Sequence, residues 1–230
     1  MSDGESRRSL TGRLARLGAW LRGTLEYAEL GHATDEAVHM SRALPRFFSV
    51  MRNCEASVLV DLGPVVGENV ALLGDLLCCK VHIENVFGDM AGLKRDRRAS
   101  EICAELPTRL DLPDSSVDAV LCWDVLDYLS PPAAATLVAE VARTLKPGGV
   151  GLAIFSTIRS DEQRYRKYVM VDEYHLRHRS YPAAQGPHRL WSSRDVQRLL
   201  VNLEVDESFL LAHRQRETLF HKPMRAGESR

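Results

Sequence analysis

The sequence has few cysteines and no paired cysteine motif. Its 230 residues include five cysteines, and none of them forms a C-x-x-C pair or a Cys/His ligand box. An odd number of thiols without metal-ligand spacing is typical of a reducing compartment, so we interpret them as small core residues rather than disulfides or zinc ligands. These residues are Cys54, Cys78, Cys79, Cys103 and Cys122.

Long apolar runs and a large excess of either charge are also absent. No apolar run is long enough to span a bilayer, and the N-terminus lacks the uninterrupted apolar core of a secretory signal, so we expect a cytoplasmic protein. The formal net charge is -1, with 45% hydrophobic and 27% charged residues. This composition gives no strong nucleic-acid signal and indicates one globular domain with a short appendage.

A helical extension is expected over residues 1–50. Leucines recur at helical spacing from Leu10 to Leu25, which predicts an amphipathic helix at about residues 9–28 with a basic face that includes Arg13, Arg16 and Arg22. This helix either packs on its own domain with a solvated basic face, or docks onto a protein partner or a membrane surface, which would make the protein a peripheral membrane protein. A second helix is expected to start near Thr34 and to be interrupted or restarted at Pro45.

Residues 51–222 are expected to form the main domain, followed by a tail at 223–230. Short apolar runs alternate with helical segments from residue 57 onward, which is typical of a parallel sheet covered on both faces. The clearest strands are "SVLVDL", "KVHIE", "VDAVLCW" and "VGLAIFST", and "TRLDLP" is expected to hold a short further strand. The closing segment alternates like two antiparallel strands that meet around Arg214 and Gln215.

The ends of these strands carry the candidate functional residues. In an open α/β sheet, ligands bind beyond the carboxyl ends of the strands. A glycine turn there lets the backbone approach a ligand, and an acid at the end of the next strand can bind both hydroxyls of a ribose. Gly67 precedes Glu84 by one helix and one strand, which suits this arrangement.

These motifs together resemble the class I S-adenosylmethionine-dependent methyltransferases. The resemblance rests on "VLVDLGPVVG", on Glu84, on "LDLPDSSVDAVLCWDVLDYL" and on "VARTLKPGGV". It implies a Rossmann-like three-layer α/β/α sandwich, with a mostly parallel seven-stranded sheet that ends in an antiparallel hairpin. It also implies S-adenosylmethionine as the cofactor, and methyl transfer to a small-molecule or macromolecular acceptor that the sequence does not identify.

The resemblance also implies roles for residues on the first two strands. Asp61 ends the first strand and would belong to the cofactor site. Gly63 and Gly67 would shape the loop beneath the methionine part of the cofactor, and Glu84 would bind the ribose hydroxyls. The alternative is that these are ordinary loop residues of a Rossmann-like sheet.

Four further residues follow the later strands. By the same resemblance, Asp111 and Leu112 would flank the adenine, and Trp123 would border the methyl-transfer site. Asp124 is the candidate catalytic residue on the acceptor side, because it directly follows a central strand. A structural alternative for Asp124 is to cap the following turn.

The glycine loop departs from the family pattern. The usual loop reads G-x-G-x-G, whereas Val65 stands here between Gly63 and Gly67. A β-branched residue is strained if this position needs a positive φ, so the loop must be either rebuilt or closed. Thr108 also stands where many relatives have an acid. A catalytically inactive methyltransferase-like scaffold or protein-interaction module is therefore the alternative function.

An insertion at about residues 158–191 interleaves basic and aromatic residues. Examples are Arg166, Lys167, Tyr168 and Tyr174. Such a segment either binds phosphates and stacks bases, or forms a lid whose aromatic side chains face inward over the cleft. The histidines within it lack a metal-ligand spacing, so no metal site is predicted.

Overall fold

The computed structural model describes residues 37–54, 56–84, 86, 110–158, 164–182 and 189–224. The basic helix expected at about residues 9–28 lies outside these described residues, as do Cys103 and Thr108. Docking of that helix onto a protein partner or a membrane surface therefore stays a prediction.

A twisted mixed sheet forms the centre of the molecule. In the described part of the chain it has six strands in the order β3-β2-β4-β5-β9-β8, with β3, β2, β4 and β5 parallel and with β9 antiparallel to both of its neighbours, β5 and β8. The strands are β2 (Val58–Asp61), β3 (Lys80–Ile83), β4 (Val117–Trp123), β5 (Leu145–Ser156), β8 (Glu204–Leu210) and β9 (Gln215–His221).

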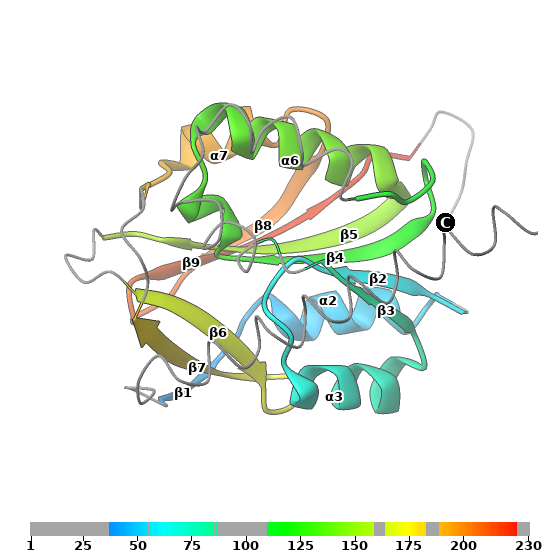
Figure 1. The fold of residues 1–230 in the computed structure, drawn as a ribbon, viewed down its shortest axis with the longest axis horizontal. Coiled ribbons are helices and arrows are strands. Elements are labelled where there is room, and N and C mark those ends of the chain that lie inside the picture. Colours follow the sequence, from blue (N-terminus) through cyan, green and yellow to red (C-terminus); the bar gives the residue numbers. More distant parts are fainter. Residues whose placement is uncertain are drawn as a thin grey trace, which may run out of the picture.

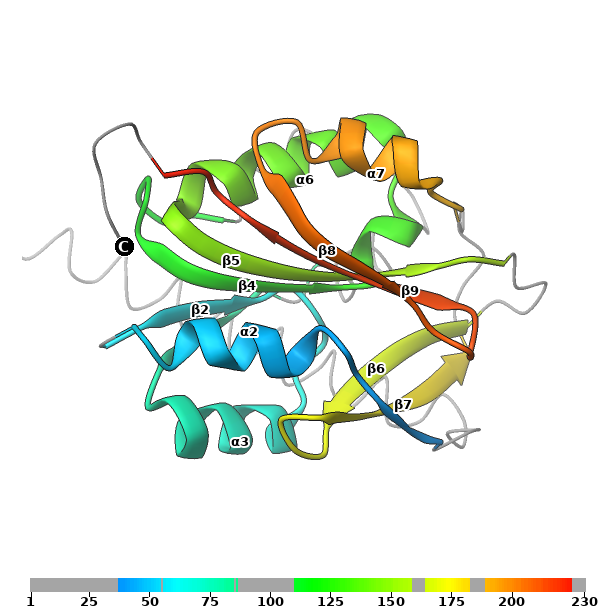
Figure 2. The ribbon, with the colours of Figure 1, turned by 180° about the vertical axis from the view of Figure 1, so that it is seen from behind.

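Helices cover both faces of this sheet, which gives the predicted three-layer arrangement. Helices α6 (Pro131–Thr144) and α7 (Ser193–Leu199) lie on one face, and α2 (Leu44–Met51) and α3 (Gly67–Leu77) lie on the other (Figures 1 and 2). A short 3-10 helix, η1 (Val125–Tyr128), links β4 to α6. The Rossmann-like α/β fold expected from the sequence is confirmed.

The two faces bury two separate hydrophobic clusters. One gathers apolar side chains of α6 and α7 against the sheet, and the other gathers side chains of α2 with residues of β2, β4 and β5. In α2, the side chains of Leu44, Phe47, Phe48 and Met51 recur at helical spacing and are all buried. This face of α2 holds the helix on the sheet through the burial of apolar surface.

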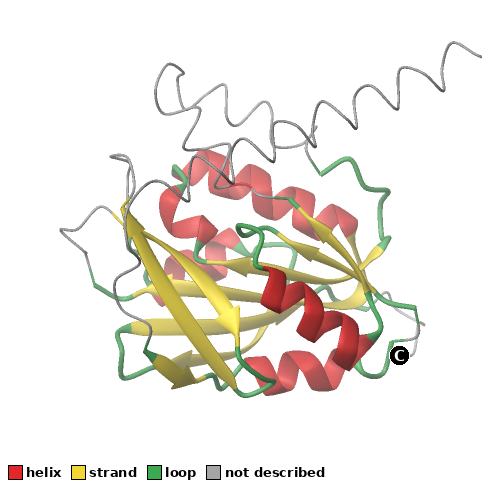
Figure 3. Ribbon diagram, turned by 60° about the horizontal axis from the view of Figure 1, so that its bottom comes forward, coloured by secondary structure: helices red, strands yellow, loops and turns green. Residues whose placement is uncertain are grey.

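A second, smaller sheet lies beside the carboxyl ends of the central strands. It is antiparallel, with the order β1-β7-β6, and consists of β1 (Val38–Met40), β6 (Arg164–Met170) and β7 (His175–Pro182). Strands β6 and β7 form a hairpin that projects beside α3 (Figure 3). This hairpin lies within the range of about 158–191 where the sequence predicts an insertion.

Two sequence predictions about the elements need correction. Residues Val38–Met40 form strand β1 and not part of a helix, because their backbone pairs with β7, which the local sequence does not reveal. The seventh strand is not confirmed: Thr108 and Arg109 of "TRLDLP" lie outside the described residues, and 110–113 form no strand. The closing hairpin is confirmed, with Arg214 at a positive φ of 63° in its turn.

Candidate functional site

Asp61 organises the corner where the glycine loop leaves β2. Its Oδ1 accepts hydrogen bonds from the backbone amide of Gly63 (2.8 Å) and from Nε1 of Trp123 (2.7 Å). The carboxyl is buried, and burial raises the pKa of Asp61 to about 6 despite both hydrogen bonds. Asp61 thus ties the loop after β2 to the end of β4.

Trp123 lies directly on Gly63. A Cβ added at Gly63 would stand 2.4 Å from Cδ1 of the Trp123 indole, so only glycine leaves room for the ring. Trp123 itself has a φ of 47°, in the left-handed region, and the pairing of β4 with β5 shifts register between Leu121 and Trp123. Such irregularities re-aim side chains at strand ends, and here the change directs the indole over the glycine loop.

Tyr168 of β6 completes this arrangement. Its ring stacks on Trp123 at a centroid distance of 5.4 Å and an interplanar angle of 3°, and both side chains are 2% exposed. The lid interpretation of the insertion, with an aromatic side chain facing inward, agrees with Tyr168. Tyr174, at the tip of the hairpin, is 49% exposed instead.

The hairpin is pinned to the first turn of α3. Asn69 is buried, and its Nδ2 donates to the carbonyl of Tyr168 (2.9 Å) while its Oδ1 accepts from the amide of Met170 (2.7 Å). The Tyr168 hydroxyl accepts from Nε2 of Gln215 on β9 (2.8 Å). Because Asn69 lies two residues after Gly67, the glycine loop and the hairpin are mechanically linked.

The glycine loop tolerates Val65 without strain. Val65 is half-buried, and its φ is not positive, so the β-branched side chain meets no backbone penalty here. Gly67 differs from Gly63, since an added Cβ at Gly67 would meet nothing within 4 Å. The fold therefore explains why residue 63 is glycine but gives no reason for glycine at residue 67.

Asp124 directly follows β4 and is fully buried. Its Oδ2 accepts from the Tyr168 hydroxyl (3.2 Å) and lies 3.8 Å from Nη1 of Arg166, while its Oδ1 has no hydrogen-bond partner among the described residues. Burial raises the pKa of Asp124 to about 6, against the attraction of Arg166. The capping alternative is wrong for the side chain, because Asp124 makes no side-chain cap hydrogen bond.

A second buried carboxyl, Asp127, lies one helical turn further on. Its Oδ2 accepts from the amide of Ser156 at the end of β5 (2.7 Å). Burial, together with the neighbouring charge of Asp124, raises the pKa of Asp127 well above its ordinary value. Arg166 donates to Oγ of Ser156 (3.3 Å), so this arginine lies between the two carboxyls and partly offsets their charge.

Replacing Asp124 by asparagine is expected to alter stability in a pH-dependent way. Its folded pKa of about 6 exceeds the ordinary 3.8, so the carboxyl stabilises the fold at low pH and loses this contribution as the pH rises through about 4 to 6. Asparagine has no such loss. The free energy of unfolding is measured by urea denaturation. Between pH 4.5 and pH 7.5, the free energy of unfolding of the variant should rise by about 2 kcal/mol relative to that of the wild type.

The variant must be compared with the wild type at each pH, because another group changes the stability of the protein with pH in the opposite direction. Burial lowers the pKa of His39 from 6.5 to about 4, so its contribution to stability is lost as the pH falls. This contribution is common to the wild type and the Asp124→Asn variant and cancels between them. A stability difference that stays constant from pH 4.5 to pH 7.5 would contradict the raised pKa of Asp124.

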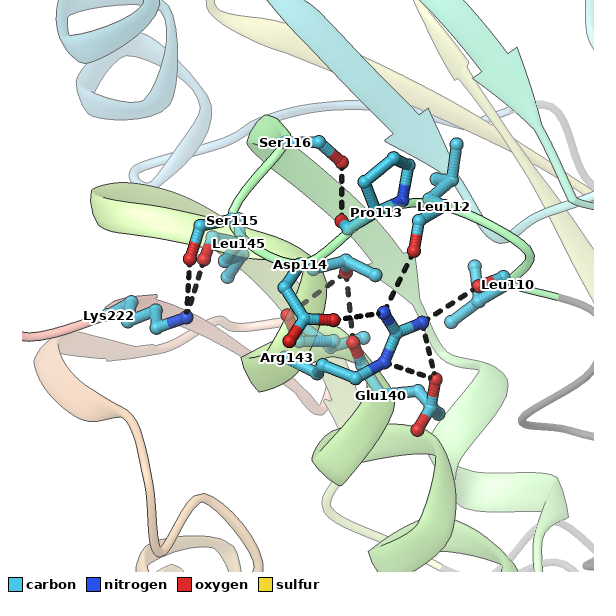
Figure 4. A network of polar contacts seen from close by, with 12 residues as sticks. Leu110, Leu112, Pro113, Asp114, Ser115, Ser116, Glu140, Arg143, Leu145 and Lys222 are labelled. Atoms are coloured by element: carbon cyan, nitrogen blue, oxygen red, sulfur yellow. Dashed lines mark hydrogen bonds and ion pairs between the residues drawn. The ribbon is translucent and has the colours of Figure 1, made fainter.

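Arg143 holds the segment predicted to flank the adenine. Its Nη2 donates to the carbonyl of Leu110 (3.0 Å), and its Nη1 donates to the carbonyl of Leu112 (2.8 Å) and to Oδ1 of Asp114 (2.7 Å) (Figure 4). Its Nη2 also lies 2.8 Å from Oε2 of Glu140, one turn back on α6. Arg143 comes from the "VARTLKPGGV" motif, so two of the family-like motifs contact each other here.

Six of the seven predicted cofactor residues fall into two groups, and Gly67 stands apart as the first residue of α3. Asp61, Gly63 and Trp123 contact one another directly, and the half-buried Glu84 joins them through its amide, which donates to the carbonyl of Asp61 (2.8 Å). In the second group, Asp111 is exposed and Leu112 packs against the core, and both belong to the segment held by Arg143.

Several residues of the site were not predicted from the sequence. Asn69 and Gln215 are polar residues inside ordinary helix and strand patterns, and no local signal marks them. Arg166 and Tyr168 did belong to the basic and aromatic insertion, but the pattern did not single them out. Within the described ranges, no group of three or more His, Cys, Asp or Glu side chains is arranged to hold a metal ion. None of the helices in these ranges could cross a membrane.

A family model described as a methyltransferase domain matches residues 60–153, from the end of β2 into β5. The match thus covers the glycine loop, Glu84, β4, Asp124 and the Arg143 motif. No curated protein matches the chain.

Solved structures of methyltransferases are similar to the chain. One is an S-adenosylmethionine-dependent methyltransferase from Clostridium acetobutylicum, with 13% identity, a TM-score of 0.48, and coverage of 91% of this chain and 99% of that one. Another is 1,6-didemethyltoxoflavin-N1-methyltransferase from Burkholderia thailandensis, with 12% identity, a TM-score of 0.45, and coverage of 95% and 90%. A third is a glycopeptide N-methyltransferase, with 16% identity, a TM-score of 0.43, and coverage of 78% and 92%.

Proposed function

We propose that the chain is a class I S-adenosylmethionine-dependent methyltransferase, as the methyltransferase-domain match over residues 60–153 supports, and that it binds S-adenosylmethionine beyond the carboxyl ends of β2 and β3 and transfers its methyl group to an acceptor. One structural observation carries this proposal: Gly67 is a glycine that the fold itself does not require. A glycine whose Cβ position is open suits a backbone that a ligand approaches closely.

Two features of the proposed site suit the cofactor. Gly67 is the first residue of helix α3, and a Cβ added there would meet nothing within 4 Å. Glu84 directly follows β3 as a half-buried acid, one strand away from the glycine loop. We propose that its carboxylate accepts hydrogen bonds from the two ribose hydroxyls, and that Asp111 and Leu112 lie along the adenine.

The methionine end does not suit the cofactor in the conformation described. The space over Gly63, where the methionine part would lie, holds the indole of Trp123. The ring of Tyr168 stacks on that indole. Binding of the whole cofactor therefore requires the indole to move away from Gly63.

The chemical demands on the protein are modest. Bound S-adenosylmethionine supplies a methyl group on a sulfonium, which is already an activated leaving group, so alignment of donor and acceptor is the main task of the protein. A general base is needed only where the acceptor must lose a proton early. We propose Asp124 for that role, since its pKa of about 6 allows it to accept a proton near neutral pH.

Substitution of Gly67 by valine tests the proposed function without disturbing the fold. The added side chain meets no protein atom within 4 Å at its Cβ, so the stability of the variant should change little. A ligand that approaches this backbone would be obstructed, and we expect the affinity for S-adenosylhomocysteine to fall at least about tenfold, or about 1.4 kcal/mol. Isothermal titration calorimetry on protein stripped of carried-over ligand measures this change.

The matched control is Gly74→Ala in the same helix. Its Cβ would also meet nothing within 4 Å, but residue 74 lies two turns away from the loop. This variant should bind S-adenosylhomocysteine as wild type does. Equal affinity of all three proteins would refute a cofactor site at Gly67, and undetectable binding by wild type would refute the proposed function as a whole.

A second candidate function is a catalytically inactive methyltransferase-like module. The observation that favours it is the buried stack of Trp123 and Tyr168 over Gly63, which fills the methionine end with the protein's own side chains. The same calorimetric titration distinguishes the two functions, because an inactive module with a permanently filled site would not bind S-adenosylhomocysteine.

A further inference from the structure

We infer that Trp123 and Tyr168 form a gate, which closes the methionine end of the cofactor site and opens when the β6–β7 hairpin releases Trp123. This inference rests on the proposed function, because it assigns a controlling element to the same site. It predicts that the protein discriminates between ligands that carry a methionine-like tail and ligands that consist of the adenosine part alone.

The closed position of Trp123 depends on its neighbours. A non-glycine residue with a φ of 47° is in a disfavoured backbone conformation, so the surrounding contacts must hold it there. Those contacts are the hydrogen bond from Nε1 to Asp61 and the stacked ring of Tyr168. Removal of the ring contact should favour an alternative position of the indole.

Tyr168 is in turn held from three elements outside its own hairpin. Its hydroxyl donates to Asp124 and accepts from Gln215, and Asn69 bonds to its carbonyl. The bond to Asn69 is the most informative of these, because Asn69 lies in the first turn of the helix that Gly67 begins. A ligand that displaces the glycine loop will also disturb the attachment of the hairpin.

The test compares two probes and four proteins by calorimetry. S-adenosylhomocysteine carries the tail that must enter past Trp123, whereas adenosine lacks that tail. Tyr168→Ala removes the stacked ring together with the hydrogen bonds of its hydroxyl, all of which stabilise the closed state, and we expect about tenfold tighter binding of S-adenosylhomocysteine. Adenosine should bind with an affinity within about twofold of wild type, because it needs no opening of the gate.

Tyr174→Ala is the matched control for this substitution. It removes the same side chain from the same hairpin, but at an exposed position away from Trp123. Its affinities for both probes should equal those of wild type. Tyr168→Phe keeps the ring and loses only the hydroxyl contacts, so it should give a gain of about threefold, and it serves as the test variant if Tyr168→Ala does not fold.

Three results would overturn the gate. If S-adenosylhomocysteine binds equally to wild type and to the Tyr168 variants, the stack does not restrict the site, while the proposed function stands. If the substitution strengthens the binding of adenosine as much as the binding of S-adenosylhomocysteine, its effect does not depend on the methionine-like tail. If no protein binds S-adenosylhomocysteine, the proposed function fails and the gate fails with it.

Hydrogen exchange on the unmodified protein gives an independent measurement. The amide of Met170 donates to Asn69, so release of the hairpin exposes it to exchange with solvent. Saturating S-adenosylhomocysteine should accelerate exchange in the peptide that contains Met170. Unchanged or slower exchange would show that the ligand binds without opening the hairpin and would overturn the gate.

Discussion

Replacement of Glu84 by alanine is expected to reduce the affinity for S-adenosylmethionine and S-adenosylhomocysteine by about 100-fold or more. Hydrogen bonds to a charged group contribute about 1.5–3 kcal/mol each, and a ribose offers two hydroxyls to one carboxylate. A loss of about 3 kcal/mol corresponds to more than a 100-fold change in Kd. Titration calorimetry of the stripped protein measures the loss directly.

The position of Glu84 makes this substitution informative. Its backbone amide, which donates to Asp61, is retained in the alanine variant, so the link between β3 and β2 is preserved. Because Glu84 is only half-buried, the free energy of unfolding of the ligand-free alanine variant should differ little from that of the wild type. Glu84→Gln separates the two properties of the side chain, since it keeps an acceptor oxygen but loses the charge, and an intermediate affinity is expected.

Asp75→Ala provides the charge-matched control for Glu84. Asp75 is an exposed acid on α3, and its removal changes the net charge by the same amount. We expect wild-type affinity in this variant. Retained affinity in Glu84→Ala would contradict the ribose site proposed at the end of β3.

The sequence was sufficient for the framework of the molecule because the framework depends on local patterns. Strand β4 was predicted with its exact ends, since "VDAVLCW" is an apolar run bounded by polar turns. Helix α7 begins with a capping box between Ser192 and Asp195, and the sequence "SSRD" indicates such a helix start. Strand β1 could not be predicted in this way, because Val38–Met40 become a strand only by pairing with β7, far along the chain.

The site shows the same division between local and distant causes. The sequence placed Gly63 and Trp123 at neighbouring strand ends, which topology alone fixes. It could not place the indole over Gly63, because that position depends on the left-handed φ of Trp123 and on Tyr168 in another sheet. Val65, which the sequence marked as the weak point of the loop, meets no backbone strain, and the obstruction comes from Trp123 instead.

Replacement of Gly151 by alanine should produce the largest loss of stability. Gly151 on β5 pairs directly with Phe220 on β9, and the far end of the Phe220 ring lies against the glycine. An added Cβ would stand 2.1 Å from Cζ and 2.2 Å from Cε2 of this ring, which is 1% exposed and has nowhere to move without displacing the core. Overpacking of this kind lowers the free energy of unfolding, and we expect a loss of about 3 kcal/mol here.

Thermal unfolding measures the effect of Gly151→Ala, and we expect Tm to fall by about 6–12 °C for that loss in a chain of this size. Gly74→Ala is the opposite case, because its Cβ meets nothing and alanine favours an exposed helix interior, so Tm should rise slightly. Truncation of the ring in the double variant Gly151→Ala, Phe220→Leu should cost less than the sum of the two single changes, because the clash that defines the first is then removed. Additive losses would show that the ring is not the obstacle and that β5 needs glycine for another reason.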